Sequence, residues 1–155
     1  VQWQTHAQLR HIESMTNLEL AQKLRDLRDF LIIAGYEESH ATRYTQIART
    51  IEKMPEPIET VAAEGRLTEI PQVGKLIATY IREILRDGVS SKQREWESEA
   101  PVSVLELVRV PGLGAKTARM LWQDYQISTL AALQAKVQTE PIAGIGPKMR
   151  EAILA

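Results

Sequence analysis

The sequence predicts an all-α protein, a helical bundle divided into two small subdomains. Apolar residues recur at helical spacing along most of the chain, and no stretch shows the sustained alternation expected of half-buried strands. A short glycine-containing motif followed by an amphipathic helix occurs three times. With 155 residues the chain can bury one good core or two small ones. These observations favour repeated helical hairpins over any sheet.

Composition narrows the function classes. The chain is 44% hydrophobic and 25% charged, which is typical of a globular protein, and it contains no cysteine. No apolar run approaches the roughly 20 residues that a bilayer span needs. His6, His11 and His40 lack metal-ligand spacing, so we expect no zinc site. The net charge of −1 argues against a broad nucleic-acid-binding basic face. We expect a cytoplasmic monomer without a membrane partner.

The first helix is predicted to follow an extension of residues 1–15, which is less periodic. Thr16 and Glu19 have the spacing of a capping box, and the leucines that follow lie on one helical face. Gly35 is suited to end this helix in the left-handed conformation. A long amphipathic helix is therefore expected between these signals.

Residues that typically start or stop a helix predict the next two helices. Ser39 is the expected N-cap of a helix that Pro55 brings to a stop, and a shorter helix within residues 57–65 closes on Gly65. Both segments carry apolar residues at helical spacing.

Three hairpins share one plan. An apolar residue is followed by a proline or small residue, a glycine-like position, a second apolar residue, a glycine and a helix. The copies are Ile70–Leu85, Val110–Trp122 and Ile142–Leu154. Their second glycines, Gly74, Gly114 and Gly146, lie 40 and 32 residues apart.

Two nucleotide-binding motifs are excluded by the residues present. The dinucleotide fingerprint needs a third glycine where Thr117 and Met149 stand, and the phosphate loop needs a glycine in place of Ala115. The remaining interpretation is a helix-hairpin-helix, whose second helix offers free N–H groups and a favourable dipole to a phosphate. Alternatively, the turns only join antiparallel helices.

Specific residues of the three hairpins are candidates for contact with DNA phosphates. Glycines let a phosphate approach the backbone, and Lys116 and Lys148 follow the second glycine by two residues. Val73, Leu113 and Ile145 are expected to point into the core. The candidate DNA-binding residues are Gln72, Gly74, Lys75, Gly112, Gly114, Lys116, Thr117, Gly144, Gly146 and Lys148.

The hairpins are not expected to contribute equally. Residues 1–65 carry seven Lys and Arg against ten Asp and Glu, whereas residues 102–155 carry six against four. Gln72 replaces the first glycine of hairpin one, where a side chain crowds a phosphate or strains the backbone, unless its amide binds the phosphate itself. We therefore expect the C-terminal hairpins to provide most of the DNA affinity.

The order of three segments, residues 17–55, 65–88 and 101–122, resembles the N-terminal region of bacterial-type family X DNA polymerases. The resemblance covers residues 16–154. It implies a polymerase-beta-like N-terminal helical domain at 16–90, which grips the 5′ side of a gap, and a helix-hairpin-helix domain at 101–155, which holds the primer-side backbone.

The implied function is sequence-independent binding of gapped or nicked double-stranded DNA in repair, as part of such a polymerase. A protein-interaction scaffold that kept the hairpins without DNA affinity is the alternative. The palm motif with its metal-binding carboxylates is not among these 155 residues, so they hold no polymerase site.

A second family activity, removal of a 5′ sugar-phosphate, uses a lysine nucleophile. The resemblance places that lysine at Tyr80, and a phenol cannot form an imine. Two further pocket lysines fall at Leu76 and His40, whereas the pocket tyrosine is kept as Tyr44. Weak lyase activity through another lysine is the third interpretation.

The resemblance also implies a monovalent cation, Na⁺ or K⁺, at two hairpins when DNA is bound, and no other cofactor. Its ligands are backbone carbonyls: those of Thr68, Ile70 and Val73 in the first hairpin and those of Val108, Val110 and Leu113 in the second.

Overall fold

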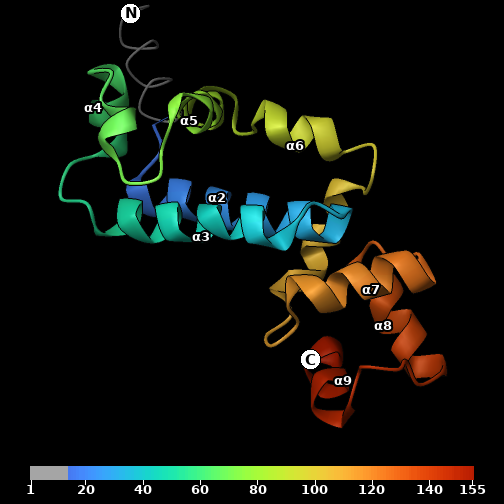
Figure 1. The fold of residues 1–155 in the computed structure, drawn as a ribbon. Helices are drawn as coiled ribbons and strands as arrows, with labels where there is room; N and C mark the ends of the chain where they lie inside the picture. Colours follow the sequence, from blue (N-terminus) through green and yellow to red (C-terminus); the bar gives the residue numbers. More distant parts are fainter. Residues whose placement is uncertain (1–13) are drawn as a thin grey trace, which may run out of the picture. The chain divides into compact units, whose positions relative to one another are not determined.

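The computed structural model describes residues 14–155 (Figure 1). In this part of the chain all regular structure is helical and no strand is present, which confirms the predicted all-α class. The predicted extension lies almost entirely outside the described residues. None of the helices described is long and apolar enough to cross a membrane.

The helices follow one another closely along the chain, and two of them, η1 and η2, are 3₁₀ helices. In order they are α2 (Asn17–Ala34), α3 (Glu38–Lys53), α4 (Ile58–Ala63), η1 (Leu67–Glu69), α5 (Lys75–Asp87), α6 (Ser91–Trp96), η2 (Val102–Arg109), α7 (Ala115–Tyr125), α8 (Leu130–Thr139) and α9 (Pro147–Leu154).

The predicted ends of α2 are confirmed. The backbone N–H of Thr16 donates to Glu19 Oε1 at 3.0 Å, and the Glu19 N–H donates to Thr16 Oγ1 at 3.0 Å, which is a capping box. Gly35 stops the helix with φ 108°. A side chain at Gly35 would also be crowded, since its Cβ would lie 3.0 Å from Arg119 Nη1.

The predicted N-cap of α3 is wrong. The helix begins one residue before Ser39, and the carbonyl of Glu37 accepts the first hydrogen bonds, from the N–H groups of His40 and Ala41 at 3.1 Å each. Ser39 is therefore a helical residue, and its hydroxyl donates to the Glu37 side chain at 3.1 Å. The shorter helix, α4, ends before Gly65, which has φ 69° as expected.

The chain forms two compact units. The first contains the described residues up to Arg25 together with Thr42–Arg94, and the second contains Asp26–Ala41 and Glu95–Ala155. Residues 26–41 thus group with the C-terminal part, in contrast to the sequence-based ranges 16–90 and 101–155. Those ranges, as functional domains, stay a prediction.

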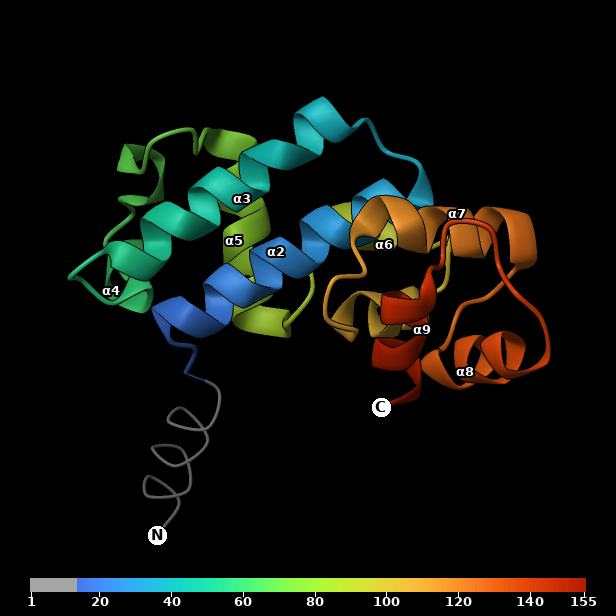
Figure 2. The same cartoon turned by 90° about the horizontal axis from the view of Figure 1, so that it is seen from below.

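In the first unit, α2 and α3 lie side by side and antiparallel (Figures 1 and 2). Arg25 of α2 binds Glu52 of α3 with two hydrogen bonds of 2.8 and 3.0 Å. Asn17 fastens the end of α3 to α4, because its amide donates to the carbonyl of Ile51 at 3.2 Å and accepts from the N–H of Ile58 at 2.6 Å. The apolar residues buried in this unit include Leu20, Leu24, Ile47, Ile51, Ile58, Leu67, Ile81 and Ile84.

In the second unit, the end of α2 is held by two arginines. Arg119 of α7 donates to the carbonyl of Ile33 at 3.0 Å, and Arg109 of η2 binds Asp26 with two hydrogen bonds of 2.9 Å. The buried cluster around these contacts includes Phe30, Ile33, Val104, Leu107, Leu113, Ala118, Leu121, Leu133, Val137, Ile142 and Ile153. Each unit therefore contains its own apolar core and its own hairpin or hairpins.

Candidate nucleic-acid interface

The three predicted hairpins have the same turn. In each, the N–H of the second apolar residue donates to the carbonyl of the first apolar residue at 3.0 Å, and the residue between them at the glycine-like position has positive φ. The φ values are 70° for Gln72, 85° for Gly112 and 90° for Gly144. A hydrogen bond from residue i+3 to residue i with positive φ at i+2 is typical of a type II turn.

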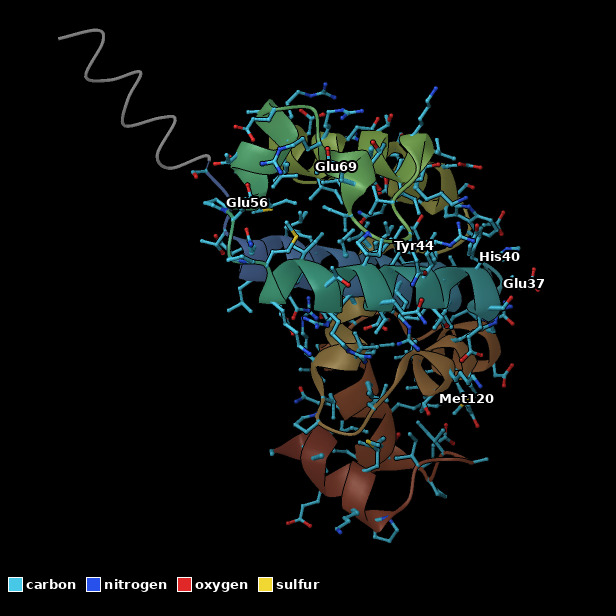
Figure 3. The ribbon with its side chains drawn as sticks, turned by 60° about the vertical axis from the view of Figure 1, so that its left-hand side comes forward. Glu37, His40, Tyr44, Glu56, Glu69 and Met120 are labelled. Carbon is cyan, nitrogen blue, oxygen red and sulfur yellow. The ribbon has the colours of Figure 1, made fainter. Side chains whose placement is uncertain are left out.

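The first glycine of the motif is required by this turn. Positive φ is accessible to glycine at little cost, whereas a residue with a Cβ is strained there. A Cβ at Gly144 would in addition lie 3.3 Å from Met120 Cε. Met120 is labelled in Figure 3. Gln72, which replaces this glycine in hairpin one, adopts the strained conformation. Backbone strain is one of the consequences expected from its sequence position.

The second glycine of the motif is not required by the chain itself. Gly74, Gly114 and Gly146 are N-cap residues with φ between −91° and −82° and nearly extended ψ, a conformation open to every residue type. A Cβ built on any of the three meets no atom of the described residues within 4 Å. The backbone at these positions is thus exposed to whatever approaches from solvent.

The helices that follow these glycines begin without a side-chain cap. In the described part of the chain, no side chain accepts a hydrogen bond at the starts of α5, α7 and α9, unlike the start of α8, where Thr129 accepts from the N–H of Ala132 at 3.1 Å. Free N–H groups remain at each of the three starts. Together with the helix dipole they form a site suited to an anion.

A protein-family model described as a helix-hairpin-helix domain matches residues 15–90. Residues 15–90, just under half of the chain, are therefore similar to helix-hairpin-helix domains.

Two curated relatives match this chain over about half its length, and both are family X DNA polymerases. DNA polymerase/3′-5′ exonuclease PolX of Bacillus subtilis (strain 168) is 28% identical over 85 residues, which are 53% of this chain and 15% of that protein. DNA polymerase lambda of Arabidopsis thaliana is 32% identical over 88 residues, 56% of this chain and 16% of that protein. The resemblance to family X polymerases is therefore confirmed, and the chain spans a small part of either relative.

The three hairpins differ in the residue at the second position of the following helix. In α7 and α9 this residue is a lysine, Lys116 or Lys148, and both side chains are exposed. In α5 it is Leu76, which is 64% exposed, and Lys75 lies at the first position instead. Hairpin one therefore presents an apolar side chain where the others present a cation.

The second apolar residue anchors each hairpin to a core to a different extent. Val73 and Leu113 are buried, as predicted, whereas Ile145 is only half-buried. Beside Ile145 and Gly146 lies an open hollow of about 530 Å³, lined also by Pro141, Pro147 and Arg150. The second apolar residue of hairpin three is therefore less firmly buried than those of the other two hairpins.

Two residues near the hairpins were missed by the sequence analysis. Glu38 Oε2 lies 3.1 Å from Lys116 Nζ. Arg150 donates through Nε to the carbonyl of Val137 at 3.2 Å, which joins α9 to α8 and leaves its charge at the mouth of the hollow. The spacing of Arg150, two residues after Lys148, could have indicated it; nothing in the sequence pairs Glu38 with Lys116.

The residues of the expected 5′-phosphate pocket have different environments. Tyr44 and Tyr80, both in the first unit, are only 4% and 8% exposed. His40 is exposed, with Nδ1 3.6 Å from a carboxylate oxygen of Glu37. The pocket stays a prediction, and the two tyrosines also serve the core.

The carbonyls expected to hold a cation lie in and beside the turns. Those of Ile70 and Val110 each accept the turn hydrogen bond. Thr68 belongs to η1 and Val108 to η2. No group of three His, Asp or Glu side chains among the described residues could hold a metal ion. The cation at the backbone carbonyls stays a prediction.

The net charges of the two compact units differ from those of the N-terminal and C-terminal parts of the sequence. The described residues of the first unit carry eleven Lys and Arg against eight Asp and Glu. The second unit carries seven against eleven, because residues 26–41 and 95–101 add acidic side chains to it. The positive excess therefore lies in the unit that contains hairpin one, opposite to the expectation.

Proposed function

We propose that this chain binds DNA without sequence preference, through the phosphodiester backbone, as the DNA-binding part of a family X DNA polymerase. The observation that carries the proposal is the open space at Gly74, Gly114 and Gly146. Since neither φ nor packing requires glycine there, an external group that approaches the backbone closely explains the three glycines.

A phosphate oxygen has the chemistry that these sites fit. It accepts hydrogen bonds from the free N–H groups of the first turn, and its negative charge interacts favourably with the helix dipole. Lys116 and Lys148 stand one turn or less from those N–H groups and can add a charge-assisted hydrogen bond. Contacts of this kind position a duplex but read no bases.

Gapped or nicked duplex DNA in repair is the proposed substrate. Both relatives are named as DNA polymerases, and the hairpins occur in two compact units, each of which can hold one stretch of backbone. We further propose that the protein acts as a monomer, and that Na⁺ or K⁺ bridges hairpin carbonyls to a phosphate when DNA is bound.

One observation favours a second candidate, a protein-interaction scaffold. The second unit, which contains two of the three hairpins, carries four more acidic than basic residues. A net negative unit weakens the general attraction to DNA, so any affinity there must come from the local geometry of the hairpins.

A titration of fluorescent DNA, followed by anisotropy, separates the two candidates. With a one-nucleotide-gapped duplex at 50 mM salt, DNA binding predicts micromolar affinity or tighter and little change when the sequence is scrambled. A continuous duplex and a nicked duplex of the same sequence measure the preference for a gap. Failure to bind any of the three at this salt concentration would support the scaffold.

A further inference from the structure

The solvent face of α3 carries a row of cations outside the hairpins. Between Thr42 and Lys53, the residues that face the core of the first unit are Tyr44, Ile47, Ala48 and Ile51. The opposite face consists of exposed polar residues at steps of three or four positions. We define the α3 strip as these residues: Arg43, Gln46, Arg49 and Lys53.

The cations of the strip form no ion pair with the described residues, and only the nearby Glu52 acts on Arg49 and Lys53 electrostatically, at longer range. The one carboxylate of this segment, Glu52, is taken by Arg25 of α2, with an ion pair of 2.8 Å. No carboxylate of the described residues lies within ion-pair distance of Arg43, Arg49 or Lys53. Two other cations of the unit are paired, since Arg66 binds Glu56 and Glu64, and Arg86 binds Asp87.

The strip continues toward hairpin one. Thr50, beside Arg49, and Met54, beside Lys53, line a hollow of about 210 Å³ whose other lining includes Ile70 and Pro71 of the hairpin turn. A ligand that lies along the strip therefore reaches the hairpin without leaving the first unit.

The same hollow contains two acidic residues. Glu56 and Glu69 both line it and are labelled in Figure 3. The carboxylate of Glu56 is bound by Arg66, whereas Glu69 is exposed beside the turn. The negative charge of Glu69 opposes the approach of a polyanion to the hollow itself, because like charges repel.

The chemistry of the strip selects a polyanion. The exposed large apolar side chains of the described residues are Leu18, Leu76 and Val102, and none of them belongs to the strip. Lipid surfaces and most protein partners are bound through apolar side chains, which the strip lacks. Cations interleaved with an amide donor are typical of contacts to DNA phosphates and sugars.

We propose that the α3 strip is a second contact for the DNA phosphodiester backbone, separate from the hairpins. At about 1.5 Å per helical residue the strip is about 15 Å long, which corresponds to about four nucleotides of one strand at about 3.4 Å each. It supplies the first unit with the cations that hairpin one lacks at Leu76. The inference rests on the proposed function.

Two triple variants with the same change of charge test this contact. The strip variant carries Arg43→Gln, Arg49→Gln and Lys53→Gln. The control variant carries Lys23→Gln, Arg82→Gln and Arg94→Gln, which are exposed residues of the same unit without an ion pair among the described residues. Thermal unfolding of both variants checks that they keep the fold.

The strip variant is expected to bind the gapped duplex at least about tenfold more weakly at 50 mM salt, and its salt slope should fall by about two to three. The control variant should lose no more than about threefold, because distant charges act only through the screened general field. A third variant, Arg43→Lys with Arg49→Lys and Lys53→Arg, should keep the wild-type affinity, since it preserves the charges.

Equal losses in the strip and control variants would overturn the inference and leave the proposed function intact, provided that Gly114→Val still weakens binding. No binding by the wild-type protein would instead overturn the proposed function and the inference together. Binding of vesicles that contain phosphatidylserine, lost in the strip variant while DNA binding is unchanged, would assign the strip to a lipid surface and overturn its DNA role.

Discussion

Lys116 Nζ lies 3.1 Å from Glu38 Oε2, so the lysine expected to face a phosphate is paired with a carboxylate of its own unit. The side chains are 76% and 46% exposed, which makes this pair weak and easily exchanged. A phosphate oxygen that binds Lys116 would therefore have to compete with the carboxylate of Glu38.

Glu38→Gln is expected to increase the affinity for gapped DNA. Exposed ion pairs contribute about 0.2–1 kcal/mol, so the gain should be no more than about fivefold at 50 mM salt and should vanish at high salt. The matched control is Glu37→Gln, which removes the same charge from the neighbouring residue. In the Lys116→Ala background the effect of Glu38→Gln should fall to that of the control; a gain that persists there would mean that Glu38 acts only through the general field.

The lysines of hairpins two and three are expected to differ in their effect. Lys148 forms no ion pair with the described residues, whereas Lys116 must leave Glu38 to bind a phosphate. Lys148→Ala should cost about 0.5–1.5 kcal/mol of DNA binding and lower the salt slope by about one. Lys116→Ala should cost less at low salt. A larger loss for Lys75→Ala than for either would make hairpin one the principal contact.

Gly114 and Gly112 are expected to separate binding from folding. Gly114→Val places its side chain in open space at φ −91°, so the melting temperature should be nearly unchanged while DNA binding weakens at least about fivefold, because the Cβ and methyl groups block the phosphate. Gly112→Val forces a β-branched residue to φ 85° and should destabilise the fold by about 1–3 kcal/mol. Circular dichroism and anisotropy measure both; loss of helix in Gly114→Val would show that this glycine serves folding.

Gln72→Gly is expected to stabilise the protein although glycine is flexible when unfolded. At φ 70° the Cβ of Gln72 costs about 1 kcal/mol or more, which outweighs the added chain entropy of glycine. Gln46→Gly, within α3, is the control with the opposite sign and should cost about 1 kcal/mol. Urea denaturation gives both values. If Gln72→Gly also strengthens DNA binding, hairpin one contacts a phosphate.

Asp29 is expected to lower stability at neutral pH. Burial raises the pKa of its carboxyl above 3.8, and the hydrogen bond from Arg28 opposes this shift only in part. Because the pKa of Asp29 is higher in the folded protein than in the unfolded chain, folding disfavours the charged carboxylate. The resulting loss of unfolding free energy is complete above the folded-state pKa and disappears below pH 3.8, where the carboxyl is protonated in both states. The difference in unfolding free energy between Asp29→Asn and wild type should thus favour the variant more at pH 7 than at pH 3. A difference independent of pH would contradict this.

The helices and turns could be predicted because their signals are local. The capping box of Thr16 and Glu19, and the stop at Gly35, depend on contacts within a few residues. The prediction at Ser39 failed because serine is a preferred N-cap type and glutamate is not, yet the helix begins directly after Glu37. A preference of residue type alone therefore placed this helix start two positions too late.

The sequence by itself determined the helical class and the places of the three turns, because backbone dihedrals and hydrogen bonds between near neighbours decide them. For Gln72 it left backbone strain as one of several possibilities, and the positive φ in the structure selected it. Only the tertiary structure decided which charges gather. It placed the acidic residues of 26–41 with hairpins two and three, paired Lys116 with Glu38, and left the Cβ space of Gly114 empty. Coulomb energy and steric access depend on distance in space, which residues far apart in the chain acquire only when the helices pack.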